Sequence, residues 1–169
     1  MPSRRPEETA SNTPWNQTFN HSMWRANNAV SRALNERLRP LDVTMTQLGI
    51  VLTLDQNGPL SGADLARGQN ITPQSVTTAL AHLERIGWIE RRPHAVHKRV
   101  LLVEPTEAGL RGMAQGRQLV ETVVEQLSDV VGGPEELARL TLGMRRIAIA
   151  FDGPDSPVAR MWPDPPGTG

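Results

Sequence analysis

The chain has 169 residues, which is enough for one folded domain with additional segments at its ends. Its 18 Lys and Arg residues balance its 18 Asp and Glu residues, and it contains no cysteine. The absence of cysteine excludes disulfides, thiolate metal ligands and thiol chemistry, and no apolar run approaches membrane-spanning length. These features fit a cytoplasmic protein without a membrane partner.

The charges are unevenly distributed along the chain. Residues 67–117 hold eight bases and four acids, whereas residues 118–169 hold four bases and eight acids. A phosphate responds to the local electric field, so a neutral chain with a basic segment can still bind nucleic acid. The composition therefore leaves a nucleic-acid partner open.

The N-terminal part is predicted to contain a loose arm and two helices. Residues 1–13 are polar and include two prolines, so we expect little regular structure there. From Pro14, apolar side chains recur at every third or fourth position and predict a long amphipathic helix that ends before Pro40. A second helix is predicted for residues 45–57, with Thr44 as its N-cap.

The middle of the chain is predicted to form a helix-turn-helix followed by a hairpin. A short helix covers residues 63–69 after Ser61, and a second helix begins at Pro73 and ends at Ile86. Gly87 can adopt the left-handed backbone conformation that commonly ends a helix. After Gly87 the spacing of apolar residues changes from that of a helix to that of a strand. Two apolar-rich runs around a short basic turn predict a two-stranded hairpin, and this order of elements is that of a winged helix.

The C-terminal part is predicted to contain two more helices. The first begins after Thr106 and ends before Gly132-Gly133-Pro134, and the second ends at Phe151. The proline-rich tail 153–169 is expected to have little regular structure. The predicted fold class is therefore mainly α with a small β-hairpin wing, a winged helix-turn-helix with long N- and C-terminal helices.

The second helix of the predicted helix-turn-helix has two different faces. A helical wheel places Val76, Ala79, Leu80 and Leu83 on one side. The opposite side is small and polar, which suits insertion into a DNA major groove, where Gln, Ser and Thr bond base edges or phosphates. For this helix alone, an ordinary solvated surface explains the pattern about equally well. The neighbouring basic hairpin favours DNA.

Four cations on the hairpin exceed what the protection of a sheet edge requires, since one or two charges prevent edge-to-edge aggregation. We therefore predict phosphate or minor-groove contacts for this wing. The predicted DNA contacts are Gln74, Ser75, Thr77 and Thr78 in the major groove, His82 and Arg85 on the backbone, and Arg91, Arg92, Lys98 and Arg99 on the wing.

The segment MTQLGIVLTLDQNGPLSGADLARGQNITPQSVTTALAHLERIGWIERR, followed by TEAGL, resembles the MarR family of winged-helix regulators. The resemblance implies a homodimer that binds pseudo-palindromic DNA, usually as a repressor, and in many members releases it on binding a small, often phenolic, effector. The family's wing usually reads Asp-x-Arg, whereas this chain has His97-Lys98-Arg99, so the charge of this wing can depend on pH. Many members also carry Arg where this chain has Thr78, which predicts a different base preference.

The long helices are predicted to form a dimer. Their stripes are too apolar to flank a small lobe alone, and pairing two chains would bury them. The rival arrangement, in which they fold back onto their own lobe, leaves more apolar surface than that lobe can cover. The predicted interface comprises Phe19, Met23, Val30, Val120, Val124, Leu127, Leu140, Met144 and Ile147. The chain is predicted to divide into five units. These are an arm (1–13), an N-terminal dimerisation helix (14–43), a DNA-binding lobe (44–105), C-terminal dimerisation helices (106–152) and a tail (153–169).

The resemblance also implies an effector cleft between the dimerisation helices and the lobe. Trp15, Trp24, Asn28 and Met45 would line it for a small aromatic or phenolic molecule, although Trp and Met at helical spacing usually belong to a dimer core.

No catalytic motif or Gly-rich phosphate loop is present, so we predict no enzymatic activity and no cofactor. His94 and His97 lie on a turn without the further ligands that a metal needs. The predicted function is sequence-specific regulation of transcription. The alternatives are a winged-helix module that binds proteins and a ligand-carrying helical dimer without a DNA function.

Overall fold

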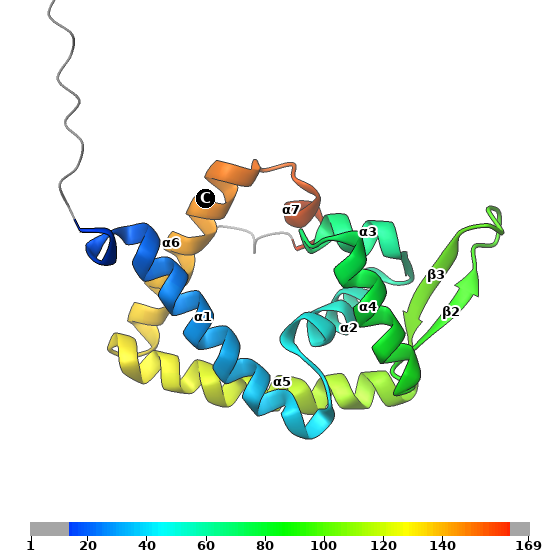
Figure 1. The fold of residues 1–169 in the computed structure, drawn as a ribbon, viewed down its shortest axis with the longest axis horizontal. Coiled ribbons are helices and arrows are strands. Elements are labelled where there is room, and N and C mark those ends of the chain that lie inside the picture. Colours follow the sequence, from blue (N-terminus) through cyan, green and yellow to red (C-terminus); the bar gives the residue numbers. More distant parts are fainter. Residues whose placement is uncertain (1–13, 163–169) are drawn as a thin grey trace, which may run out of the picture.

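The computed structural model describes residues 14–162 (Figure 1), so the predicted arm and the end of the predicted tail lie outside the described residues. The described chain is mostly helical with a small antiparallel sheet. In chain order the elements are η1 (Trp15–Gln17), α1 (Phe19–Leu38), η2 (Arg39–Leu41), α2 (Met45–Asn57), β1 (Leu60–Ser61), α3 (Gly62–Gly68), α4 (Pro73–Arg85), β2 (Ile89–Pro93), β3 (Leu101–Pro105), α5 (Glu107–Val131), α6 (Pro134–Asp152) and α7 (Pro157–Met161).

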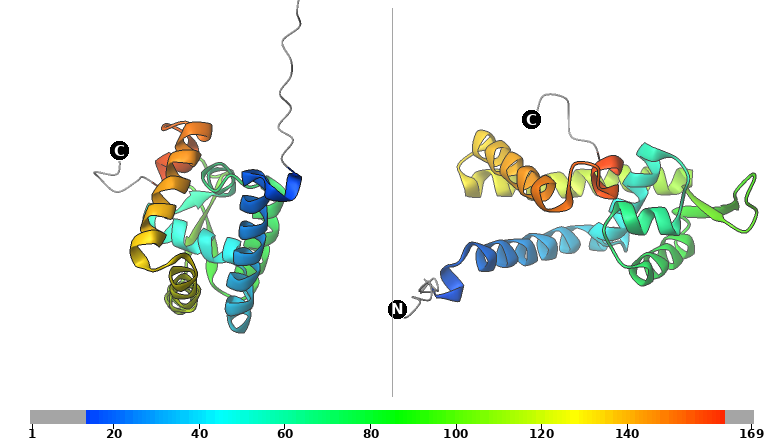
Figure 2. Two further views of the ribbon diagram at one scale, coloured as in Figure 1. Left: turned by 90° about the vertical axis from the view of Figure 1, so that its left-hand side faces the viewer. Right: turned by 90° about the horizontal axis from the view of Figure 1, so that it is seen from above.

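The molecule has a lobe at one end and long helices at the other. Figure 1 shows α2, α3 and α4 gathered in the lobe, with the hairpin of β2 and β3 projecting beyond it as a wing. The helices α1, α5 and α6 extend to the opposite side, and the view from above in Figure 2 shows the same separation. The predicted fold class, a winged helix-turn-helix with long flanking helices, is confirmed.

The start of α1 differs from the prediction. The helix begins at Phe19 rather than at Pro14, because Thr18 is extended (φ −79°, ψ 152°) and caps it by accepting the His21 N–H at 3.3 Å. The residues before Thr18 form a single 3₁₀ turn, Trp15–Gln17. The prediction that the helix begins at Pro14 is therefore wrong, because the chain becomes extended again at Thr18. The predicted end before Pro40 is confirmed.

The helices of the lobe begin at the predicted caps. Thr44 and Gln47 form a reciprocal capping box at α2, with bonds of 2.8 and 3.3 Å. Ser61 caps α3, and Thr72 caps α4 with Pro73 in the first helical position. Gly87 ends α4 with a φ of +75°, which explains why glycine stands there.

The sheet has one strand more than predicted. β2 and β3 pair as the expected hairpin, but β1 also pairs with β3, with Leu60 opposite Val103 and Ser61 opposite Leu102. The strand order is β1-β3-β2. A strand of two residues shows no periodicity, so the sequence alone could not reveal it.

The hydrophobic core lies in the lobe and extends to the N-terminal part of α5. The largest completely buried side chains are Leu38, Leu48, Ile50, Leu54, Leu65, Leu83, Val51, Val76 and Val103. Helix α5 meets this core with a glycine face, Gly109, Gly112 and Gly116, whose first two members lie against Trp88. Because glycine has no side chain, α5 can approach the lobe closely.

The tail contains a helix that the sequence did not predict. Ser156 caps α7 by accepting the Ala159 N–H at 3.1 Å, and Pro157 takes the first helical position. The new helix packs on α3, where Met161 fits against Gly68. The expectation of little regular structure is therefore wrong for residues 157–161. Proline is frequent in irregular segments, but here Pro157 follows a capping serine and begins a helix. No helix in residues 14–162 is both long and apolar enough to cross a membrane.

Thr106 connects the end of α4 to the start of α5 and provides a first test. Its hydroxyl donates to the Gly87 carbonyl at 2.6 Å and accepts the Gly109 N–H at 3.0 Å. We expect Thr106→Ala to lower the free energy of unfolding by about 1–2 kcal/mol, since both bonds disappear. Thr106→Ser keeps the hydroxyl and should remain close to wild type. Urea unfolding measures both, and equal losses in the two variants would contradict this role.

Candidate nucleic-acid interface

Helix α4 presents the polar face that the sequence predicted. Val76, Ala79, Leu80 and Leu83 are buried, and the helical-wheel orientation is thus confirmed. The exposed residues along the opposite side include Gln74, Ser75, Thr77 and Thr78. Their contact with DNA stays a prediction, but each of them is available on the surface of this chain.

The hydroxyl groups on this face are held by the helix itself. Thr77 Oγ1 donates to the Pro73 carbonyl at 2.9 Å, and Thr78 Oγ1 donates to the Gln74 carbonyl at 3.1 Å. The Ser75 hydroxyl bonds the hydroxyl of the cap Thr72 at 2.8 Å. Each oxygen keeps capacity to accept a further bond. Within the described chain, the Gln74 amide has no hydrogen-bond partner, so it is the freest polar group of the face.

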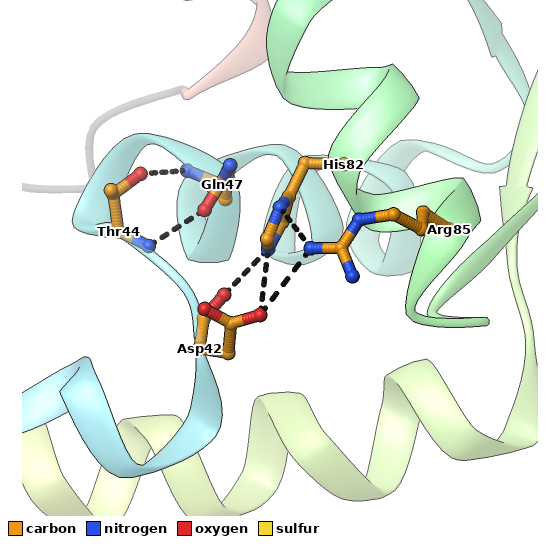
Figure 3. A network of polar contacts seen from close by, with 5 residues as sticks. All are labelled: Asp42, Thr44, Gln47, His82 and Arg85. Carbon is orange, nitrogen blue, oxygen red and sulfur yellow. Dashed lines mark hydrogen bonds and ion pairs between the residues drawn. The ribbon is translucent and has the colours of Figure 1, made fainter.

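The far end of α4 is occupied by contacts within the protein. His82 Nε2 lies 2.6 Å from the backbone carbonyl of Asp42, and Arg85 reaches both the Asp42 carboxylate, at 3.4 Å, and His82 Nδ1, at 2.9 Å (Figure 3). The sequence predicts that His82 and Arg85 meet the DNA backbone, and it does not indicate Asp42 as their partner. Nothing local signals this contact, because Asp42 is 40 residues from His82 in the sequence.

The cations of the wing fall into two groups. Arg91 pairs with Glu84 at 3.0 Å, and Arg92 pairs with both Glu90 and Glu104. The hydrogen bond from Arg92 lowers the pKa of the Glu90 carboxyl, and the bond to Glu90 with the nearby charge of Glu104 raises the pKa of Arg92. The free positive charge on the strands is therefore smaller than the four cations of the hairpin suggest.

The tip of the wing keeps its charge. Lys98 and Arg99 lie in the exposed turn between β2 and β3, and neither makes an ion pair with any residue of the described chain. His94 organises this turn, since its Nδ1 accepts the N–H groups of Val96 at 3.1 Å and His97 at 3.0 Å. The two histidine rings stack at 5.2 Å. Among residues 14–162, no group of three or more potential metal ligands was found.

The residues predicted for an effector cleft do not all come together in one chain. Trp15 in η1 and Trp24 in α1 flank His21, with ring centroids 6.0 and 5.9 Å away, and both tryptophans are exposed. Asn28 is exposed further along α1, whereas Met45 packs against the lobe core. A hollow of about 500 Å³ lies between the ends of α2, α6 and α7, and none of these four residues lines it.

The residues predicted for the dimer interface form apolar surface on the single chain. Phe19 is 60% exposed and Met23 40%, on α1. Leu140 and Met144 are exposed on α6. The half-buried members of the set are Val30, Val120, Val124, Leu127 and Ile147.

The helix-turn-helix, the sheet and the projecting basic tip define a winged-helix protein of the DNA-binding class. The model of the MarR family matches residues 43–101. An HTH-type transcriptional repressor of Mycobacterium bovis is 31% identical over 124 residues, which are 73% of this chain and 83% of that protein. The multiple antibiotic resistance protein MarR of Escherichia coli is 32% identical over 94 residues, 56% of this chain and 65% of that protein.

Solved structures of MarR-family proteins resemble the fold of this chain. A mutant of E. coli MarR complexed with operator DNA superposes with a TM-score of 0.69 at 26% identity, covering 76% of this chain and 91% of that one. Wild-type E. coli MarR in its apo form gives a TM-score of 0.67 at 26% identity, over 77% of this chain and 96% of that one. This chain belongs to the MarR family of winged-helix, DNA-binding transcriptional regulators. Family and fold are those of regulators rather than enzymes.

Proposed function

We propose that two copies of this chain form a homodimer that binds a pseudo-palindromic operator. The observation that carries the proposal is the outward face of α4, whose polar side chains Gln74, Ser75, Thr77 and Thr78 stand opposite a buried apolar face. A helix with short polar side chains can enter a major groove, and its N-terminal N–H groups attract phosphate.

The wing tip supports the same contact. Lys98 and Arg99 are free of acidic partners in the described chain, whereas Arg91 and Arg92 are neutralised by nearby carboxylates. The tip would therefore supply most of the attraction of the wing to phosphate or to a narrow minor groove. The E. coli relative bound to operator DNA shares this fold, which agrees with the proposed contact.

The apolar surface of α1 and α6 supports the dimer. Exposed side chains such as Phe19, Met23 and Met144 would leave a single chain with much unprotected apolar area. A two-fold pair would place its two α4 helices about 34 Å apart, one turn of the duplex. This spacing is what a pseudo-palindromic operator requires.

The proposal includes repression of transcription by the bound dimer and release of the dimer from DNA by a small molecule. The M. bovis relative is described as a repressor, which favours this sign of regulation. A small aromatic or phenolic effector that binds one dimer conformation better than the other would shift the population and lower DNA affinity. Trp15 and Trp24, which are 65% and 60% exposed, provide aromatic surface for such a molecule once a partner chain covers them.

Salt-titrated binding to selected DNA tests the proposal. Fragments selected from genomic DNA would supply the operator, and fluorescence anisotropy would measure affinity as a function of salt. We expect a steep linear loss of affinity with the logarithm of salt concentration, because bound phosphates release counterions. Lys98→Ala or Arg99→Ala should each reduce the slope by about 1.8, since a dimer loses two contacts of about 0.9 each.

The matched control removes a charge elsewhere. Arg139 on α6 pairs with Glu136, and Arg139→Ala should leave the slope unchanged. A winged-helix module that binds only proteins would show no preference for a palindrome. A ligand-carrying dimer without a DNA function would retain its activity in Arg99→Ala, and either result would overturn the proposal.

A further inference from the structure

We propose that His82, which is bonded to the backbone carbonyl of Asp42, is a positioning residue that fixes the recognition helix α4 relative to the long helix α1. The proposal rests on the proposed binding of a homodimer to a palindrome, and it assigns His82 a role other than contact with DNA. The contacts that support it lie at the corner where α1 has ended and α2 is about to begin (Figure 3).

Asp42 has an unusual backbone at this corner. Its φ of +55° and ψ of 35° lie in the left-handed region, which Asp adopts more readily than most residues. This conformation accompanies the change of direction between η2 and the cap of α2, and the Asp42 carbonyl accepts a bond from His82 on α4. The same residue therefore shapes the corner and binds α4.

The contacts determine which nitrogen of His82 carries the proton. The guanidinium of Arg85 has only donors, so His82 Nδ1, 2.9 Å from it, must accept. In the neutral ring Nε2 then carries the hydrogen and donates to the Asp42 carbonyl at 2.6 Å. Each ring nitrogen has a partner, and the side chain is only 22% exposed, so the ring is held on both sides.

The bond between His82 and Asp42 connects two helices with different proposed roles. Helix α4 carries the polar DNA-facing surface, while α1 carries Phe19 and Met23, which the proposed partner chain would cover. Asp42 comes directly after the 3₁₀ turn η2 that follows α1. The bond from His82 to Asp42 therefore connects helix α4 to the end of α1, one of the helices proposed to form the dimer. Without this bond, α4 is held by its apolar face and by the exposed ion pairs of Arg85 with Asp42 and of Glu84 with Arg91. The spacing of the two α4 helices would then vary more.

The expected signature is a loss of discrimination between half-site spacings. A rigid dimer should bind its operator much more tightly than the same half-sites separated by one additional base pair. If the link sets the spacing, breaking it should lower affinity for the operator and leave affinity for the altered site nearly unchanged. A residue that contacted phosphate directly would instead lower affinity for both sites equally.

Three variants separate these possibilities. His82→Gln places an amide N–H near the former Nε2 and should retain the bond to the Asp42 carbonyl, whereas His82→Asn is too short to reach it. Asp42→Gly retains the carbonyl and readily adopts a positive φ, but it removes the carboxylate that lies 3.4 Å from Arg85 and 3.7 Å from His82 Nε2. We expect the preference for the correct spacing to fall about tenfold in His82→Asn and to remain in His82→Gln and Asp42→Gly.

The experiment measures anisotropy on both DNA duplexes with the full-length chain, together with the sedimentation of each variant and its thermal unfolding. Unchanged spacing preference in a folded, dimeric His82→Asn would overturn the inference, as would equal losses in His82→Gln and His82→Asn. Failure of the wild-type chain to prefer any palindrome would instead refute the proposed function. The two failures are therefore distinguishable.

Discussion

Replacing Gly109 with Ala is expected to lower the free energy of unfolding by about 3 kcal/mol, the upper part of the usual range for overpacking. A Cβ added to Gly109 would lie 2.8 Å from the Trp88 carbonyl carbon and 3.1 Å from its Cα, and closer still to its carbonyl oxygen. These are backbone atoms, which cannot rotate away. The Trp88 carbonyl is also held in place, since it accepts the Thr106 N–H at 3.0 Å.

The matched control for this substitution is Gly143 on α6. An added Cβ there meets no atom within 4 Å in the single chain, so Gly143→Ala should gain roughly 0.5–1 kcal/mol from helix propensity. Urea unfolding monitored by circular dichroism gives both values. If Gly109→Ala were as stable as wild type, α5 would not approach Trp88 as closely as the structure shows.

The glycine face of α5 has a wider consequence. Glycines inside a helix cost roughly 0.5–1 kcal/mol each relative to alanine, so their presence needs a compensating contact. Here Gly112 lies against the Trp88 ring and Gly116 lies against Leu48, which brings α5 directly onto the lobe. The same helix continues beyond Val120, which packs on the core of the lobe, with the apolar residues Val124 and Leu127. One rigid element therefore links the DNA-binding lobe with the surface proposed for dimerisation.

The features that the sequence predicted well depend on local signals. Thr44, Thr72 and Thr106 are N-caps that bond a backbone N–H three residues later. Because this contact is local, their role can be predicted without knowledge of the fold. The orientation of α4 follows from its period, since Val76 and Leu83 face the core.

The features that the sequence did not predict depend on contacts between distant residues. Arg91 and Arg92 looked free until the fold placed Glu84 and Glu104 beside them. The pairing of the two-residue strand β1 with β3 and the bond between His82 and Asp42 join segments that are far apart in the sequence. In the candidate site, the polar face of α4 and the basic wing tip are therefore predictable from the sequence, whereas the ion pairs that neutralise Arg91 and Arg92 are not.

Replacing Gln74 with Glu should weaken operator binding roughly a hundredfold, with a cost of about 1.4 kcal/mol per protomer. The two side chains have nearly the same shape, so the substitution introduces a negative charge at an unchanged position. Gln74 is exposed in the first turn of α4, where the proposal places it in a major groove close to phosphates. A carboxylate would be repelled there and could no longer donate the amide hydrogen bonds.

The stability of the protein should change in the opposite direction. A carboxylate in the first turn of a helix interacts favourably with the helix dipole, so Gln74→Glu should gain roughly 0.3–1 kcal/mol of unfolding free energy. Weaker binding with higher stability cannot result from misfolding, and this combination makes the test specific to the DNA-facing role. Gln118→Glu, on the exposed side of α5, adds the same charge and should leave binding within about twofold because distant charges are screened. Equal losses in the two variants, measured by anisotropy at fixed salt, would show that the total charge of the protein rather than the face of α4 determines the affinity.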